Sequence, residues 1–265
     1  MIFKKILGIA FMKRQNQELD NISMRMGFID IAHNLLQNPS NSLVSNPKFI
    51  SFLKKQIIRP LMKNCTSTNL SLLSNSLSIF YFVVKYFRRH FLDEISVFVL
   101  DIVIPMIESV NNRYPPKSLM VKILRNIVQE PKISIDFFVN FDSNKQRSNI
   151  LEKIILTLTK VAKGKFAKSE YANTVTKEEE EDIKKLSTIA LVKMTNSIDS
   201  YVTNELNEGK SIVTLETKPK TKREKNIVKQ LIRIQAARDS KQRETEAIEK
   251  FNLKIKHGIL LFKEL

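Results

Sequence analysis

Glycine, tryptophan and cysteine are scarce in this chain: its 265 residues include 5 Gly, 1 Cys and no Trp. So few glycines argue against a sheet protein with many tight turns, and against a glycine-rich phosphate-binding loop. The single cysteine, Cys65, has no partner for an internal disulfide, which suits a reducing compartment. We expect Cys65 to be a small buried apolar residue.

Long apolar runs are also missing. Near the start, Lys4 and Lys5 leave only the short run 6–12, which Lys13 and Arg14 follow without a small-residue cleavage site. This pattern is not that of a signal peptide. No stretch approaches the ~20 consecutive apolar residues that a helix needs to cross a bilayer. The sequence therefore predicts a cytoplasmic protein.

Acidic residues are outnumbered: 27 Asp and Glu face 44 Lys and Arg, for a formal net charge of +17. A basic surface attracts nucleic acid, anionic membranes or acidic proteins, and charge alone does not choose among them. The sequence has no zinc-finger spacing and no aromatic-basic ribonucleoprotein motif, so nucleic acid is not an expected partner. The candidates for membrane contact lie in a basic stretch near the C-terminus: Lys218, Lys220, Lys222 and Arg223.

Motifs that carry chemistry are absent from the sequence. His33, His90 and His257 lie far apart, and no HExxH, CxxC, GxSxG or GxxxxGK[ST] occurs. Catalysis needs a convergent set of groups such as a nucleophile with a base, paired carboxylates or metal ligands. We therefore expect no catalytic residue, no cofactor and no metal.

What is present is helical periodicity. The clearest case is 70–87, where six apolar residues spaced three and four apart share one face: Leu70, Leu73, Leu77, Phe80, Val84 and Phe87. Asn46 and Pro47 predict a helix start, and Pro60 should kink or end that helix. A further helix is expected to bury Leu92, Ile95, Val99, Ile102 and Met106, with Pro105 disturbing its last turn. A new helix is expected to begin at Pro115 and Pro116, with Leu119, Ile123 and Ile127 on one face. Pro131 marks the next break between helices.

Capping signals define the later helices. Asn149 with Glu152 predicts one helix start and Gly164 predicts its end, while Thr176 with Glu179 predicts the next start. From Asn204 to about Lys225 the periodicity fails, as in a linker. A basic helical stretch follows.

Helices of this length with short connections predict an all-α fold, an armadillo/HEAT-like helical solenoid of antiparallel helices. No strict repeat occurs at a fixed period, so the repeats must be degenerate, and a compact bundle is the competing architecture. We expect a helical domain over 1–203, a basic linker over 204–236 and a third segment over 237–265.

Two motifs carry a resemblance to a known family. The run Asn140, Phe141, Asp142, Ser143 and Asn144 resembles the box of the "homology upstream of Sec-seven" domain, which reads Asn, Tyr or Phe, Asp, Cys, then Asp or Asn. Ser143 stands where the family has cysteine. Similar residues also occur in family order at 49–50, 77–80, 97–98 and 149–153.

The second motif, 251–259, looks like the opening of the Sec-seven catalytic domain, Phe-Asn-x-x-Pro-Lys-Lys-Gly-Ile. Ile255 replaces the usual proline and His257 a lysine. The preceding run 241–244 fits the first helix of that domain. The resemblance therefore implies a homology-upstream-of-Sec-seven domain over 1–203 and the truncated start of the Sec-seven catalytic domain over 237–265. The chain is therefore similar to the BIG/Sec-seven group of large Arf guanine-nucleotide exchange factors.

The resemblance implies a regulatory scaffold of an exchange factor in Golgi vesicle trafficking. It implies an upstream dimerisation domain as partner, an Arf-family GTPase bound through the catalytic domain, and recruitment from the cytoplasm to anionic Golgi membrane. The exchange groove and its glutamate finger are expected beyond Leu265, so the chain reads as an excised fragment or incomplete gene product. A basic helical-repeat adaptor that binds membranes or acidic proteins without exchange is the alternative.

The box itself has two interpretations. Asn and Asp side chains can bond nearby backbone amides and fix a turn between helices, with Asn140 ending one helix. The same cluster can instead be a surface that docks the upstream domain, and we expect docking at Asn140–Asn144.

Overall fold

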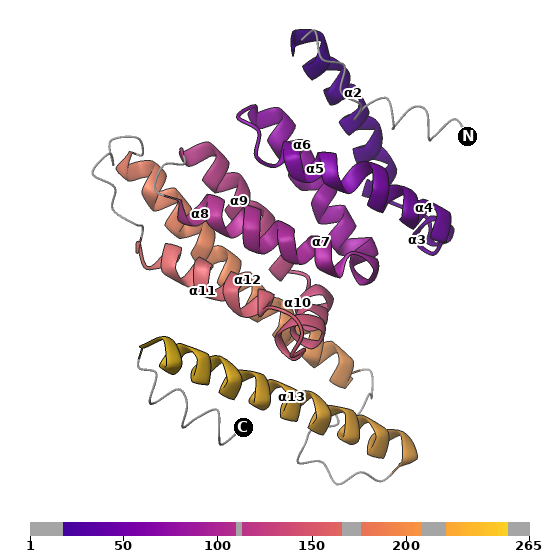
Figure 1. Cartoon of the computed structure of the whole chain (residues 1–265), viewed down its shortest axis with the longest axis vertical. Coiled ribbons are helices and arrows are strands. Elements are labelled where there is room, and N and C mark those ends of the chain that lie inside the picture. Colours follow the sequence, from indigo (N-terminus) through magenta and orange to yellow (C-terminus); the bar gives the residue numbers. More distant parts are fainter. Residues whose placement is uncertain (1–17, 110–112, 166–175, 208–220, 254–265) are drawn as a thin grey trace. The chain divides into compact units, whose positions relative to one another are not determined.

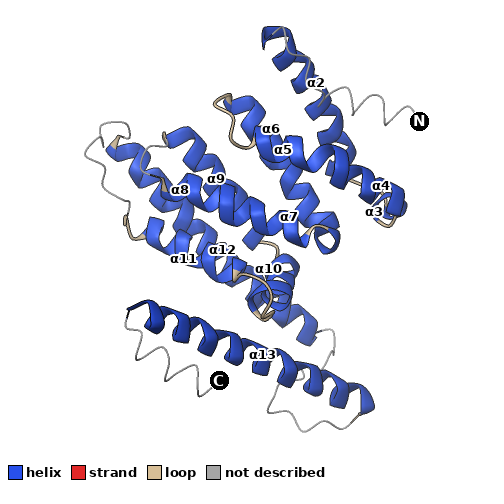
Figure 2. Cartoon of the chain, viewed as in Figure 1, coloured by secondary structure: helices blue, strands red, loops and turns tan. Residues whose placement is uncertain are grey.

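A computed structural model of the chain describes residues 18–109, 113–165, 176–207 and 221–253. Every regular element in these residues is a helix, as Figure 2 shows, which confirms the all-α prediction. The chain divides into two compact units. Unit 1 comprises the described parts of Met1–Ile133 and Ile154–Met194, and unit 2 those of Ser134–Lys153 and Thr195–Leu265.

Unit 1 is built from helices that pack side by side (Figure 1). Helix α6 (Leu70–Phe82) contacts both α2 (Glu18–Gln37) and α9 (Tyr114–Val128). Helix α5 (Ile58–Asn64) contacts α6, and α8 (Ile104–Glu108) contacts α9. This stacking of sequential helix pairs is the arrangement of a helical solenoid. The shorter elements of unit 1 are α3 (Asn41–Val44), α4 (Pro47–Phe52), η1 (Leu53–Ile57), η2 (Val83–Phe87), η3 (Arg88–His90), α7 (Leu92–Val97) and η4 (Phe98–Val103).

The helix that begins at Asn46 forms as predicted but does not end at Pro60. The Asn46 side chain accepts hydrogen bonds from the amides of Lys48 and Phe49, at 2.9 and 3.2 Å. The π-helical segment η1 then precedes α5, which continues through Pro60. Proline removes an i→i−4 hydrogen bond, and a π-helical turn upstream lets the chain continue with altered pairing.

A second π-helical segment, η4, rotates the buried face of the helix that contains Pro105. Ile95 and Val99 are fully buried as expected, but Ile102 and Met106 are only partly buried. In their place the chain buries residues one position further on, Val103 and Ile107. A π-helical turn holds more residues than an α-helical turn, so the inward face advances along the sequence. The predicted face of this helix was therefore wrong after Val99.

The apolar stripe of α6 and η2 is confirmed at five of its six positions. Leu73, Leu77, Phe80, Val84 and Phe87 are buried. The sixth, Leu70, is 43% exposed because it is the first residue of the helix, directly after the N-cap Asn69. The ring of Phe80 stacks on that of Phe98, with 3.4 Å between centroids.

The helical stretch Leu70–His90 is 21 residues long and contains an 18-residue window with a mean hydropathy of 1.3, so by length and composition it could cross a membrane. The expectation that no stretch approaches this length was wrong. Half of this window is buried inside the protein, where α6 packs against α2 and α9. Core helices pass the same test of length and hydropathy, and burial accounts for the apolar side chains here.

The capping signals of the later helices are largely confirmed. Helix α11 (Ile150–Ala162) ends before Gly164, whose φ of +65° is the left-handed conformation that favours glycine. Helix α12 (Lys177–Asn207) begins with reciprocal bonds between Thr176 and Glu179, at 2.9 and 3.2 Å.

Parts of the predicted linker 204–236 are helical. Helix α12 continues to Asn207, and α13 (Lys222–Leu253) begins within the predicted 204–236 segment. Thr221 and Glu224 form a second capping box at the start of α13, a Thr-x-x-Glu signal that our reading of 204–225 missed. The proposed boundary at 236–237 lies inside α13, and the division into domains stays a prediction.

Candidate functional site

The box residues lie at the end of a helix in unit 2. Helix α10 (Pro131–Phe137) continues into the π-helical segment η5 (Phe138–Asp142). The helix therefore ends at Asp142 rather than at Asn140. The Asn140 side chain donates a hydrogen bond to the Asp136 carbonyl at 2.9 Å, which ties it to the preceding turn. The chain then turns, and the Ser143 amide donates to the Phe138 carbonyl at 2.8 Å.

Asp142 caps the helix that follows the box. Its two carboxylate oxygens accept from the amides of Leu151 and Glu152, at 3.0 and 2.8 Å. These amides lie in the first turn of α11, where helix N–H groups have no helical partner. The predicted helix start at Asn149 is confirmed, because Asn149 directly precedes α11 and its carbonyl accepts from the Lys153 amide at 3.2 Å, but the Asn149 side-chain oxygen does not accept the amides of the first turn. A carboxylate nine and ten residues upstream serves both amides, and the Asn149 amide group instead donates to the Glu152 carboxylate at 2.5 Å.

Burial governs the ionisation of this carboxyl group. Burial raises the pKa of Asp142, and the bonds from the Glu152 and Leu151 amides and the nearby charge of Lys241 oppose that rise. The side chain is 8% exposed. Asp142 is thus held inside the protein by the helix end that it caps.

Phe141 lies in the core of this region. It is fully buried, and its ring meets that of Phe137 edge to face, with 5.5 Å between centroids. The Arg147 guanidinium lies 5.6 Å from the centroid of the Phe141 ring. Ser143 is also buried, whereas Asn140 and Asn144 are partly exposed. Only the two asparagines of the box are therefore accessible to solvent, while its three middle residues are buried.

Lys241 of α13 binds the main chain of the box. Its ammonium donates to the Phe141 carbonyl at 2.7 Å and lies 3.4 Å from the Asp142 carbonyl. The last carbonyls of a helix have no helical partner, and a cation there is also favoured by the helix dipole. Burial lowers the pKa of Lys241, and the carboxylates of Asp142 and Glu152 oppose this effect.

Two further contacts join α13 to the same segment. Lys145 forms an ion pair with Glu244, with 3.0 Å between Nζ and Oε1. The Arg238 guanidinium lies 5.3 Å from the centroid of the Phe138 ring. Arg238, Lys241 and Glu244 are spaced three apart, so they share one face of α13. No local pattern of residues indicates this contact, because its partners are about a hundred residues apart.

Two of the four candidate membrane-contact residues lie in the described part of the chain. Lys222 and Arg223 are exposed in the first turn of α13. Lys218 and Lys220 lie outside the described residues. The second motif begins in the last turn of α13, and its residues 254–259 also lie outside the described part of the chain.

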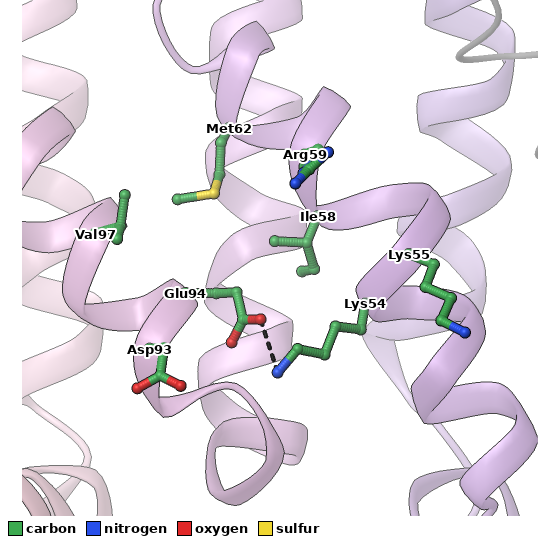
Figure 3. A pocket seen from close by; sticks show the side chains of 8 residues that line it. All are labelled: Lys54, Lys55, Ile58, Arg59, Met62, Asp93, Glu94 and Val97. Carbon is green, nitrogen blue, oxygen red and sulfur yellow. Dashed lines mark ion pairs between the residues drawn. The ribbon is translucent and has the colours of Figure 1, made fainter.

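A concavity of about 530 Å³ in unit 1 is another candidate site (Figure 3). Lys54 points toward Glu94 across this concavity and forms an ion pair with it at 2.9 Å. The full lining is Lys54, Lys55, Ile58, Arg59, Met62, Asp93, Glu94 and Val97. This set contains no nucleophile paired with a base. Among the described residues, no group of three or more His, Cys, Asp and Glu is placed to hold a metal ion.

Comparisons with known proteins identify the family of the chain. The profile of the family described as "Mon2/Sec7/BIG1-like, HUS domain" matches residues 1–150. The chain is similar to Brefeldin A-inhibited guanine nucleotide-exchange protein 4 of Arabidopsis thaliana, at 24% identity over 217 residues, 80% of this chain. It is also similar to protein 1 of that name from Homo sapiens and to protein 2 from Arabidopsis thaliana, at 28% and 31% identity over 131 residues, 49% of this chain.

The chain spans only a small part of these relatives: the matched regions cover 12% of the first protein and 7% of each of the other two. The profile match covers more than half of the chain, contains the complete box and ends at the first residue of α11. The chain therefore belongs to the Mon2/Sec7/BIG1-like family and contains its HUS domain.

Proposed function

We propose that this chain is a regulatory scaffold of an Arf guanine-nucleotide exchange factor acting in Golgi vesicle trafficking, and that it lacks the exchange site. Family membership and the names of the relatives support the link to nucleotide exchange. The HUS region of the family is non-catalytic, and the concavity of Figure 3 has no catalytic set among its lining residues.

The contact between Lys241 and the box carries the proposal. The run 241–244 fits the first helix of the Sec-seven domain by resemblance, and both Lys241 and Glu244 contact the box segment. The contacts of Lys241 and Glu244 would hold α13 against the box. They would thereby set the position at which the exchange domain begins. We infer that the box transmits the state of the scaffold to the exchange domain through α13.

The same proposal includes the partners that the resemblance implies. The upstream dimerisation domain would bind the helical scaffold, and an Arf-family GTPase would bind the exchange domain that follows. The protein would be cytoplasmic and recruited to Golgi membrane. Docking of the upstream domain at Asn140–Asn144 is restricted by burial of Phe141 and Asp142, so Asn140 and Asn144, with the 40% exposed Val139, are the residues that such a partner would touch.

Amide hydrogen exchange on the full chain tests whether the bonds from Lys241 to the box stabilise α13. Lys241→Met removes the ammonium that binds the two carbonyls and keeps an apolar stem of similar length. We expect the amides around 238–247 to exchange at least about tenfold faster, because each 1.4 kcal/mol of lost contact is a factor of ten in an opening equilibrium. Lys250→Met is the matched control, since Lys250 is exposed on the same helix. Equal exchange in the two variants would refute the proposal.

Nucleotide release from Arf proteins tests the absence of an exchange site. The chain should leave release at its intrinsic rate at every concentration, and dose-dependent acceleration would contradict a non-catalytic role.

Vesicle binding tests the membrane contact. Neutralising Lys218, Lys220, Lys222 and Arg223 should abolish salt-sensitive binding to anionic vesicles, because each basic residue near such a surface contributes on the order of 1 kcal/mol. Equal binding to neutral and anionic vesicles would exclude this electrostatic contact.

A further inference from the structure

One long part of unit 1 contains no acidic residue. Between Asp30 and Asp93 the sequence has neither Asp nor Glu. The same span carries eight Lys and Arg: Lys48, Lys54, Lys55, Arg59, Lys63, Lys85, Arg88 and Arg89. A region with charges of one sign produces a field that concentrates anions near it. This charge is independent of the box and of α13.

Some of these charges are neutralised by acids from outside the span. Lys54 forms an ion pair with Glu94 at 2.9 Å, and Lys85 forms one with Glu130 at 3.1 Å. Arg89 has no such partner, and neither does its neighbour His90. Both side chains are exposed, and neither forms an ion pair within the described residues. Lys48, Lys55, Arg59 and Lys63 also have no ion pair among the described residues, but Arg89 and His90 are adjacent and lie at the end of the α6 and η2 helix.

A concavity of about 480 Å³ opens at this position, between the end of α3 and the short helix η3. It is lined by Val44, Ser45, Tyr86, Arg88, Arg89 and His90, with no carboxylate among them. Its volume lies within the roughly 300–1,000 Å³ of small-molecule sites. Three consecutive basic side chains around a hollow of this size form a receptor for a small anion rather than a flat charged surface.

Local bonds hold the walls of this pocket in place. The Arg88 guanidinium donates to the Lys85 carbonyl at 2.8 Å, which fixes it at the end of the helix. The Tyr86 hydroxyl donates to the Gln37 carbonyl of α2 at 3.2 Å, which fixes the aromatic wall. A binding group that is positioned before the ligand arrives loses less conformational entropy when it binds.

We propose that this pocket binds a phosphomonoester, carried by a membrane lipid headgroup or by a soluble phosphorylated polyol. Guanidinium groups match phosphate oxygens with paired N–H donors, and the His90 imidazole adds a further donor. A phosphomonoester carries a charge of about −1.5 to −2 at neutral pH, more than the single charge of a phosphodiester. The exposed Arg89 guanidinium and His90 imidazole therefore favour the monoester, next to the Arg88 guanidinium that the Lys85 carbonyl holds in the pocket wall.

Binding to the full chain tests this proposal. One arm titrates soluble inositol 1,4-bisphosphate, and the other uses phosphatidylcholine vesicles that contain phosphatidylinositol 4-phosphate. Vesicles with phosphatidylserine at equal total charge control for diffuse attraction. Binding in the soluble arm assigns a free polyol phosphate as sufficient, and binding only to the phosphorylated vesicles assigns the lipid headgroup.

Variants separate the pocket from general basicity. Arg89→Gln with His90→Gln removes two exposed donors and should weaken binding by at least about tenfold, as expected for loss of charge-assisted bonds. Lys63→Gln removes one positive charge from the same acid-free span at an exposed position outside the pocket, and should change binding by less than about twofold. Equal losses in the two variants would overturn the proposal. So would equally tight binding to the phosphatidylserine vesicles, or no binding in either arm.

Discussion

The ammonium of Lys241 donates a hydrogen bond to the main-chain carbonyl of Phe141, with 2.7 Å between Nζ and O, across a hundred residues of sequence. The next residue, Asp142, uses its side chain to cap α11. Adjacent positions of the box thus hold two different segments of unit 2, one through a carbonyl and one through a carboxylate. This arrangement gives the box a structural role that does not need a partner protein.

Loss of the Asp142 carboxylate should destabilise unit 2. Asp142→Ala removes both acceptors of the α11 amides, so we expect a loss of about 0.5–2 kcal/mol in the free energy of unfolding, typical of a lost N-cap. Asp142→Asn keeps one acceptor oxygen and should lose less. Urea denaturation measures both, and Asp101→Ala, at an exposed position, is the control. If partner binding falls while stability stays unchanged, the box is a docking surface rather than a turn.

The ion pair between Lys145 and Glu244 should contribute little despite its 3.0 Å geometry. Both side chains are more than 40% exposed, so water and salt screen their attraction. A double-mutant cycle with Lys145→Ala and Glu244→Ala should give a coupling energy below about 1 kcal/mol that shrinks as salt is added. A larger, salt-insensitive coupling would mean that this pair, and not Lys241, holds α13 against the box.

Local signals in the sequence were enough to predict most helix ends. Asn46 and the Thr176–Glu179 box cap helices as their residue types predict, since capping depends on residues only three positions apart. Gly164 likewise ends α11 in the one conformation that glycine favours. The all-α fold followed from such signals together with periodicity.

The sequence could not reveal features that depend on distant residues or on small changes of helical pitch. Asn149 has the right residue type for a cap, but Asp142 takes that role because the preceding turn brings its carboxylate to the α11 amides. The rotated face after Val99 depends on one π-helical turn, which no spacing of apolar residues indicates. The contact of Lys241 with Phe141 exists only in the folded chain.

Titration of the Cys65 thiol should make stability depend on pH in the alkaline range. Cys65 is fully buried, and burial raises its pKa from 9.0 to about 12. Above pH 9 the unfolded thiol ionises while the folded thiol stays protonated, so unfolding becomes more favourable. The stability present below pH 9 should fall by up to about 1.4 kcal/mol per pH unit as pH rises toward 12.

Comparison with Cys65→Ala isolates this effect from the titration of lysine and tyrosine. The variant leaves a small cavity whose cost does not depend on pH, so the stability advantage of the native chain should shrink between about pH 8 and pH 10. Urea denaturation under reducing conditions measures this difference. A difference that stays constant with pH would mean that the thiol ionises as easily in the folded protein as in the unfolded chain.

Replacing Ser143 with cysteine should stabilise the protein. The Ser143 hydroxyl is buried and has no hydrogen-bond partner among the described residues. A buried polar group without a partner costs about 1–3 kcal/mol, and a thiol is a weaker donor that tolerates apolar surroundings. The box that Asn140–Asn144 resembles has cysteine at this position, so a thiol is expected to fit here. We expect Ser143→Cys to raise the free energy of unfolding by about 1 kcal/mol.

Two variants test the cause of this gain. Ser143→Ala removes the hydroxyl without adding a sulfur, so it should be close to neutral, because relief of the unpaired group is offset by the gap that it leaves. Ser148→Cys, at an exposed position five residues on, should change stability by less than about 0.5 kcal/mol. Measurements under reducing conditions exclude disulfides with Cys65. If Ser143→Cys and Ser143→Ala both destabilise the protein, the Ser143 hydroxyl makes a stabilising hydrogen bond in solution. Its burial would then carry no free-energy cost.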